Sequence, residues 1–345
     1  MAHPPLHLHA HGLEHLSSPS PALRPLTRRA LLRAGARASL AGLFAGLLLP
    51  AAAAVAASDP ASDTPLAFRE VAEGIFVRFG VHEEVTAANC GAIANTGFIV
   101  GEDSVAVIDS GTTHRQGLAL REAVAAATDK PISHLFATHV HFDHCFGHSA
   151  FADLPLRSIG HRNLPRALAE RGPFYSELLT ETCPDFAGTV VVPPNETVTD
   201  RLQVDLGHRP LQVRAWRTAH TNTDLTVFDE KTGTLWTGDL VFAERLPTLD
   251  GSINGWLQVL DELLDDGVVR IVPGHGPVSD GRAALAAERA YLETLRNGVR
   301  AAIAEGLDIP ATLERLGSDN EQNWQVFEHN HGRNIVSAYT ELEWE

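Results

Sequence analysis

Cysteine is scarce in this chain of 345 residues, which contains Cys90, Cys145 and Cys183 and no others. Three cysteines are too few for a disulfide scaffold, and their spacing resembles no zinc finger, so we expect at most one disulfide bond. The hydrophobic content of 44% and the charged content of 20% are ordinary for a soluble globular protein. The length suits one large domain or two small ones.

Positive charge is also scarce once the N-terminus is set aside. The whole chain has 27 Lys and Arg against 43 Asp and Glu, a formal net charge of −16. Residues 1–57 hold five of the arginines and a single acid, Glu14, so the remainder has 22 basic and 42 acidic residues and a net charge of about −20. A surface this acidic argues against nucleic acid and anionic membrane as partners.

The first 57 residues have the features of an export signal. Arg28 and Arg29 lie in the run Thr-Arg-Arg-Ala-Leu-Leu-Arg at 27–33, which resembles a twin-arginine signal. An apolar run at 38–57 follows, and Ala-Val-Ala at 54–56 matches an A-x-A cleavage pattern. The alternative interpretation is an uncleaved membrane anchor. We predict a cleaved signal at 1–57, a polar linker at 58–65 and a domain at 66–345, in a periplasmic protein without stable membrane association after cleavage.

Hydrophobic patterns in the remainder predict strands interspersed with helices. Helices are expected at 114–127, 253–264 and 280–305. Strands are expected at 74–79, 92–100, 104–109, 132–137, 189–192, 211–216, 225–228, 234–236 and 268–272. Two similar halves, each a sheet with covering helices, indicate a layered α/β/β/α sandwich.

A dense group of polar residues directly follows the expected buried strand at 132–137. The segment 139–144 reads His-Val-His-Phe-Asp-His, so His139, His141, Asp143 and His144 are four potential metal ligands within six residues. Burying several imidazoles and a carboxylate without partners is costly, and zinc accepts both ligand types. The alternative is a surface loop that happens to be rich in histidine. We interpret the segment as a metal-binding loop.

The pattern H-x-H-x-D-H resembles the signature of the metallo-β-lactamase superfamily, and further elements follow in that family's order. They are Ala219-His220-Thr221, Thr237-Gly238-Asp239 and Pro273-Gly274-His275-Gly276, with Asp109 closing a strand upstream. The resemblance covers nearly all of residues 66–300. It implies an α+β fold, the four-layer αβ/βα sandwich, here with a C-terminal helical extension at 280–345.

The resemblance also implies the role of each residue. One zinc ion would take His139, His141 and His220. A second would take Asp143, His144 and His275, and Asp239 would bridge the two. Asp109 would support the ligands through hydrogen bonds, and Asp143 would also accept a proton during turnover. The chain departs from the β-lactamases at Asp239, where those enzymes have cysteine or serine, and is similar there to glyoxalase II and lactonases.

A narrower resemblance rests on residues 247–252, 255–256 and 341–345, which look like the exported quinoprotein relay system zinc metallohydrolases. It implies a quinoprotein dehydrogenase system as a possible partner. We therefore expect an exported binuclear zinc hydrolase, in which a metal-bridged hydroxide attacks an ester, thioester, lactone or amide carbonyl of a small-molecule substrate. The alternatives are a β-lactamase-like activity, a mono-iron persulfide dioxygenase, or an accessory protein of the quinoprotein system.

Several other residues admit two interpretations. Cys145 is interpreted as a small buried residue behind the metal loop, with a disulfide to Cys90 as the alternative. Tyr175 and the segment 82–84 are open as substrate contacts. His148, His161 and His208 are interpreted as ordinary histidines because both metal sites are already filled. The polar cluster at 329–334 has no assigned chemistry.

Overall fold

The computed structural model describes residues 67–264, 267–318 and 324–345. The predicted export signal at 1–57 and the linker at 58–65 lie outside the described residues. No helix in the described part of the chain combines the length and the apolar character needed to cross a bilayer.

Two β-sheets form the centre of the domain. The first has the order β1 to β7 and the second the order β12-β11-β10-β9-β8. The strands of the first sheet are Arg69–Ala72, Ile75–Arg78, Thr96–Val100, Val105–Ile108, Ile132–Phe136, Arg157–His161 and Glu196–Val198. Those of the second, from β8 to β12, are Arg201–Asp205, Pro210–Ala215, Leu225–Asp229, Thr234–Phe242 and Arg270–His275. In the first sheet the pairs β4-β5, β5-β6 and β6-β7 are parallel, and in the second sheet β11-β12 is parallel. The other neighbouring strands are antiparallel.

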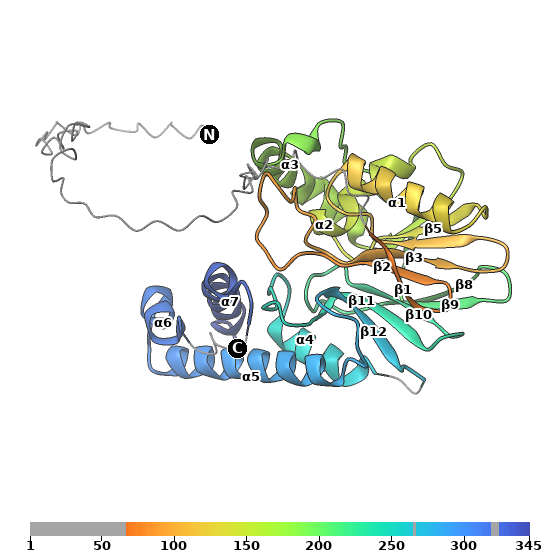
Figure 1. The fold of residues 1–345 in the computed structure, drawn as a ribbon. Coiled ribbons are helices and arrows are strands. Elements are labelled where there is room, and N and C mark those ends of the chain that lie inside the picture. The colour runs from red at the N-terminus through yellow and green to blue at the C-terminus, as the bar shows by residue number, and fades with distance from the viewer. Residues whose placement is uncertain (1–66, 265–266, 319–323) are drawn as a thin grey trace, which may run out of the picture. The chain divides into compact units, whose positions relative to one another are not determined.

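Helices cover the outer faces of both sheets. Figure 1 shows α1 (His114–Ala127), α2 (Phe142–Cys145) and α3 (Leu164–Thr182) on the side of the first sheet. On the side of the second sheet lie α4 (Ile253–Glu262) and the long α5 (Arg282–Ala304), followed by α6 (Ile309–Leu316) and α7 (Phe327–Leu342). Short 3₁₀ helices occupy Phe146–Phe151 and Pro184–Phe186. The predicted α+β four-layer sandwich with C-terminal helices is confirmed.

One buried hydrophobic cluster lies between the two sheets. Ile75, Ile108 and Phe136 of the first sheet belong to the same buried cluster as Val227 and Val272 of the second. All four residues of β4 and all nine of β11 are buried. Strands covered on both faces favour continuous apolar runs such as Val-Ala-Val-Ile in β4.

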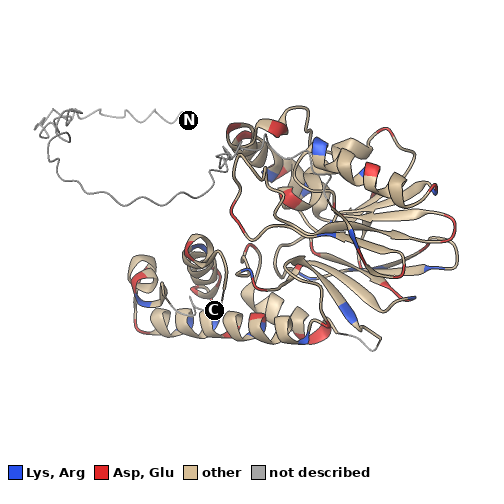
Figure 2. Cartoon of the chain, viewed as in Figure 1, with Lys and Arg blue, Asp and Glu red and all other residues tan. Residues whose placement is uncertain are grey.

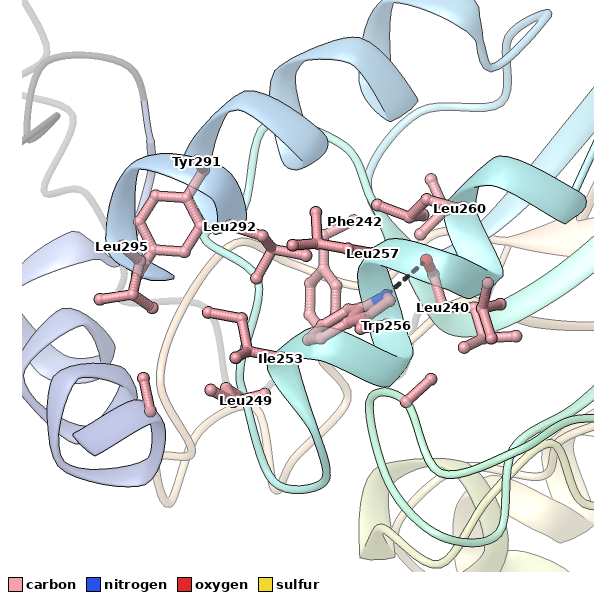
Figure 3. Close-up of a cluster of buried hydrophobic side chains, with 14 of the residues drawn as sticks. Leu240, Phe242, Leu249, Ile253, Trp256, Leu257, Leu260, Tyr291, Leu292 and Leu295 are labelled. Carbon is pink, nitrogen blue, oxygen red and sulfur yellow. Dashed lines mark hydrogen bonds between the residues drawn. The ribbon is translucent and has the colours of Figure 1, made fainter. Parts of the chain in front are cut away.

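A second core joins the C-terminal helices to the second sheet (Figure 3). Trp256 of α4 is fully buried, and its indole nitrogen donates a 3.1 Å hydrogen bond to the Leu240 carbonyl of β11. Phe242, Leu292 and other side chains of β11 and α5 surround it. Each such side chain contributes about 1.5–3 kcal/mol when fully buried, so α4 and α5 are firmly fixed against β11.

The strand predicted at 189–192 is absent, and β7 lies further along at Glu196–Val198. Pro193 and Pro194 follow the valines directly, and proline cannot donate to a sheet ladder. Val191 packs beside Gly172 of α3 instead, while Val190 is exposed. Helix α3 was not predicted, and it contains Pro173 in its interior.

One disulfide bond joins Cys90 to Cys183, across 93 residues of chain. It ties the loop before β3 to the end of α3. The alternative pairing of Cys90 with Cys145 is therefore wrong. Cys145 is a free, buried thiol, as its interpretation as a small buried residue required.

Charged residues are spread over the elements (Figure 2). Acidic and basic residues are interspersed along α5, and others lie on α1, α3 and the strand ends. Many ion pairs of the described residues are on the surface, such as Arg157 with Glu196. Arg209 and Asp229 form a buried pair, with 2.8 Å between Nε and Oδ1.

Candidate metal centre

Loops at the ends of strands bring the seven predicted ligands together. The chain leaves β5 at Phe136 and passes through His139 and His141 into the short helix α2, which carries Asp143 and His144. His220 lies in the turn between β9 and β10, and His275 ends β12. The Leu225 backbone nitrogen, at the start of β10, donates a 2.8 Å hydrogen bond to the Thr138 carbonyl and so links the loop after β5 to the second sheet.

Asp239 reaches the centre from within β11, where the ladder with β12 is irregular on both sides of Gly238. Gly238 has a φ of 50°, a conformation that favours glycine. A Cβ atom on Gly274 would lie 1.9 Å from Asp239 Oδ1, so only glycine leaves room for this carboxylate. Local geometry thus explains the glycine in each of the motifs Thr-Gly-Asp and Pro-Gly-His.

The first group of candidate ligands is His139, His141, His220 and Asp239, whose ligand atoms lie within 4.8 Å of one another. His141 Nδ1 is 3.0 Å from Nε2 of His139 and 3.0 Å from Nε2 of His220. Asp239 Oδ2 is 3.6 and 3.5 Å from the same two Nε2 atoms. Two ligands on one tetrahedral zinc ion lie roughly 3.3 Å apart, so these spacings fit a shared ion.

Hydrogen bonds on the far side of the rings orient this group. His220 Nδ1 donates to the Thr248 carbonyl at 2.7 Å, because a carbonyl can only accept. His141 Nε2 donates to the Asp250 carboxylate at 2.9 Å. In the neutral rings, His220 Nε2 and His141 Nδ1 therefore point lone pairs at each other. A cation between them removes that repulsion.

A hydrogen bond on its outer ring nitrogen orients His139 in the same way. The hydroxyl of Thr138 donates to Asp109 Oδ2 at 2.8 Å, and it accepts from His139 Nδ1 at 3.1 Å. His139 Nε2 then also presents a lone pair to the centre.

The second group is Asp143, His144 and His275, again within 4.8 Å of one another. His275 Nδ1 donates to the Ile93 carbonyl at 2.9 Å, which turns its Nε2 toward Oδ2 of both Asp143 and Asp239, each at 3.4 Å. His144 Nε2 lies 3.1 Å from Asp239 Oδ1. Neither of these last two atoms has a hydrogen-bond partner, although both are buried. Buried orphan atoms of this kind fit a metal ion.

Asp109 holds the metal loop in place. It accepts 2.8 Å hydrogen bonds from the backbone nitrogen and the hydroxyl of Thr138, and a 2.7 Å bond from His144 Nδ1. Its φ is 53°, a region that aspartate tolerates better than most residues. It lies behind the ligands and does not face the centre.

The sequence profile described as "Metallo-beta-lactamase superfamily" matches residues 91–275, which include all seven of these side chains. This chain belongs to the metallo-beta-lactamase superfamily. Members of this superfamily are typically hydrolases, and the buried His and Asp groups agree with that assignment.

Several solved structures share the fold. A metallo-beta-lactamase from Pontibacter korlensis is 16% identical, with a TM-score of 0.54, and the match covers 66% of this chain and 99% of that one. A metallo-beta-lactamase from Hirschia baltica is 20% identical, with a TM-score of 0.50 and coverages of 66% and 97%. The sec-alkylsulfatase Pisa1 from Pseudomonas sp. is 16% identical with a TM-score of 0.63, and 80% of this chain spans 50% of that enzyme. A search among curated proteins found no match.

Electrostatics of the centre favour the metal-binding protonation states of His139, His220 and Asp239. Burial and the neighbouring His144 hold the pKa of His139 well below its usual range. Burial lowers the pKa of His220 to about 3. Burial opposes ionisation of Asp239, but the charges of His275, His144 and His139 hold the pKa of that carboxyl well below its usual range. Neutral imidazoles and ionised carboxylates are the forms that bind zinc. His144 differs, because burial opposes its protonation but the charges of Asp239, Asp109 and Asp143 hold its pKa well above its usual range.

Two residues beside the centre were missed as site residues. Asp250 accepts from His141, and Arg171 of α3 contacts the same Asp250 oxygen. Burial opposes ionisation of Asp250, but its hydrogen bond with His141 and the Arg171 charge lower its pKa to about 2. Asp250 was noted only within the narrower resemblance, and Arg171 belongs to the unpredicted helix α3.

Tyr175 lies beside this pair. Its ring meets that of His141 edge-on, with 6.2 Å between centroids, and also packs against Phe142 at 5.3 Å. Burial and the Asp250 charge raise the pKa of Tyr175 to about 12, so its phenol stays protonated. The structure thus brings Tyr175, whose role as a substrate contact was left open, beside His141 of the centre.

The remaining predicted residues lie elsewhere. Ser110 bonds to His148 at 2.7 Å, the Asn163 backbone donates to His161, and His208 lies in the turn between β8 and β9. The segment 82–84 contacts Glu244, Arg245 and Asn330. In the cluster at 329–334, His331 and Asn334 are buried in α7, whereas His329 and Arg333 are exposed.

Proposed function

We propose that this protein is an exported hydrolase that binds two zinc ions. The observation that carries the proposal is the pair of ligand groups meeting at Asp239, with lone pairs of five buried or half-buried histidines turned inward by hydrogen bonds on their outer nitrogens. One ion would be held by His139, His141 and His220 and the other by Asp143, His144 and His275, with Asp239 shared. The complete second group favours two ions over the single iron of a persulfide dioxygenase.

Zinc bound there would supply Lewis acidity and a water of lowered pKa, which is the requirement for hydrolysis at neutral pH. The chain's own residues then divide the remaining work. Asp143, whose Oδ2 lies 3.4 Å from His275 Nε2, would accept the proton released when water attacks. Tyr175 and Phe142 offer aromatic surface beside His141 for the substrate. An ester, thioester, lactone or amide is the substrate class we propose.

Export is supported by two independent features. The twin-arginine pattern and the A-x-A site precede the domain. The Cys90–Cys183 disulfide suits an oxidising compartment such as the periplasm. A quinoprotein dehydrogenase system as partner rests on the narrower sequence resemblance alone.

A sulfate ester is the second candidate substrate. The Arg171 guanidinium lies beside the centre with a third of its side chain exposed, and guanidinium groups pair well with sulfur oxyanions. The Pisa1 match also extends over more of this chain than the β-lactamase matches do. Substitution of Arg171 would then reduce turnover of sulfate esters more than that of neutral esters.

Elemental analysis of the purified protein, followed by assays on ester, lactone, thioester, amide, β-lactam and sulfate-ester substrates, tests the proposal. We expect about two zinc ions per chain and hydrolysis of at least one class. His139→Ala and Asp239→Ala should lose both metal and activity, whereas His329→Ala, at an exposed histidine of α7, should retain both. One iron per chain would favour the dioxygenase, and full zinc without hydrolysis would favour an accessory role.

A further inference from the structure

We propose that the C-terminal helix α7 is part of the metal centre, with Asn334 as a positioning residue that holds the segment 247–250 against two of the ligands. The inference rests on the proposed metal binding and adds a role for helices outside the region matched by the superfamily profile. It also assigns a role to the polar cluster at 329–334.

The segment 247–250 provides the outer partners of two ligands in the first group. The Thr248 carbonyl accepts from His220 Nδ1 at 2.7 Å, and the Asp250 carboxylate accepts from His141 Nε2 at 2.9 Å. Such partners set the tautomer and the orientation of a ligating imidazole. The position of this short segment therefore controls where two of the nitrogens point.

Asn334 forms hydrogen bonds with this segment on both sides of Thr248. Its Oδ1 accepts from the Leu249 backbone nitrogen at 2.9 Å, and its Nδ2 donates to the Pro247 carbonyl at 2.6 Å. The Asn334 side chain is fully buried. Alanine at this position would leave both main-chain groups without these partners in the interior.

The orientation of the Asn334 amide is itself determined. His331 Nε2 donates to the Leu316 carbonyl at 2.9 Å, because the carbonyl only accepts. In the neutral ring, His331 Nδ1 then accepts from the Tyr291 hydroxyl at 2.9 Å. The Tyr291 oxygen in turn accepts from Asn334 Nδ2 at 2.8 Å. A directed chain of hydrogen bonds from α6, α7 and α5 thus ends on the segment beside the metal ligands.

A second contact from α7 fixes the chain just beyond the segment. The Glu341 carboxylate accepts 2.7 Å hydrogen bonds from the Ser252 hydroxyl and from the Ile253 backbone nitrogen at the start of α4. The segment is therefore held by Asn334 and is followed directly by a second attachment to the same helix.

The inferred effect is selective for one group of ligands. His220 and His141 both belong to the first group. In the second group, His144 is oriented by Asp109 and His275 by the Ile93 carbonyl, which Asn334 does not contact. Loss of Asn334 should weaken the first ion and leave the second unchanged, an outcome that general loss of packing would not produce.

The experiment measures zinc affinity in Asn334→Ala by competition with a chromophoric chelator. The two groups are separated in two backgrounds: His275→Ala, which disables the second, and His220→Ala, which disables the first. Asn330→Ala is the matched control, because Asn330 is a buried amide of α7 that bonds to Glu84 and Val326 instead. Arg333→Ala is the exposed control on the same helix.

We expect Asn334→Ala to weaken zinc binding about 10-fold in the first group and to leave the second within error, with both control variants resembling the wild type. If Asn334→Ala folds poorly, Tyr291→Phe should show a smaller loss in the same group, because it removes the hydroxyl between Asn334 and His331 but keeps both contacts of Asn334 with the segment 247–250. Unchanged affinity in the first group, or equal losses in both groups, would overturn the inference. A wild-type protein that binds no zinc would instead overturn the proposed function.

Discussion

Asp109 supports both the metal loop and a ligand, although it does not face the centre. We expect Asp109→Asn to weaken zinc binding by about 10–100-fold, because His144 loses its carboxylate partner while every ligand remains. Asparagine is the suitable replacement, since it tolerates the positive φ of this position. Chelator competition measures the effect, and Asp153→Asn, in an exposed ion pair with Arg121, is the control. Wild-type affinity in Asp109→Asn would show that the carboxylate only braces the backbone.

Glu288 makes the stability of the domain depend on pH. This carboxyl of α5 is fully buried, its Oε1 accepts from the Phe242 backbone nitrogen, and its Oε2 has no hydrogen-bond partner. Burial, with a smaller effect of the Asp239 charge, raises the pKa of Glu288 well above its usual range. The folded state then keeps a proton that the unfolded chain loses, so this group's contribution to stability is greatest in acid and falls as pH rises above about 4.5.

We therefore expect Glu288→Gln, which is neutral at every pH, to remove this loss. The slope of the unfolding free energy against pH should differ from that of the wild type by up to about 1.4 kcal/mol per pH unit above pH 4.5. Urea unfolding of both proteins between pH 4.5 and 8 measures it. Parallel curves for the two proteins would mean that Glu288 is ionised in the folded state.

At the residue scale, the sequence was sufficient to predict which side chains meet when those side chains lie in short, distinctive motifs. The cluster at 139–144 and the short motifs around His220, Asp239 and His275 predicted the side chains that meet in the structure. Arg171 and Asn334 carry no such signal, because each matters only through a contact made by distant packing. The contacts of a single polar residue on a helix cannot be predicted until the position of that helix in the fold is known.

At the element scale, the disulfide ties α3 to the loop before β3, so that two segments beside the centre share one covalent link. We expect Cys183→Ser to lower the unfolding free energy by about 2–5 kcal/mol, mainly because the unfolded chain gains freedom across a loop of 93 residues. Urea unfolding with and without a reductant measures this. The reductant should destabilise the wild type and leave Cys183→Ser unchanged. Cys145→Ala, at the free thiol, should keep the response to reductant.

Elements were predictable where local signals agreed with packing. Helix α1 has the predicted bounds, because the Thr113 hydroxyl caps its first turn by accepting from the Gln116 nitrogen. The valines at 190–192 led to a wrong strand prediction at 189–192, because the prolines that follow them prevent strand pairing there. Helix α3 was missed for the opposite reason, since Pro173 lowers its local propensity while Leu168 and Leu179 bury its inner face.

At the scale of the whole molecule, the candidate metal centre joins the two halves of the sandwich. His139 and His141 follow β5 of the first sheet, whereas His220, Asp239 and His275 belong to the strands and turns of the second. An ion held by ligands from both halves binds the folded chain and not the unfolded one. Metal binding should therefore contribute directly to the stability of the whole domain.

Removal of metal with a chelator should accordingly lower the melting temperature. At free zinc about 1,000 times the dissociation constant, one site adds about 4 kcal/mol, and a domain of this size shifts by roughly 2–4 °C for each kcal/mol, so we expect a fall of about 10 °C or more. The difference between zinc-loaded and chelated protein should shrink in acid, because protons compete for the imidazoles and carboxylates. Calorimetry at pH 7.5 and pH 5 measures both effects. Zinc added back should restore the original melting temperature in the wild type but not in Asp239→Ala, since Asp239 alone is shared by both ligand groups. Equal melting temperatures with and without chelator would mean that the two halves hold together without any help from metal.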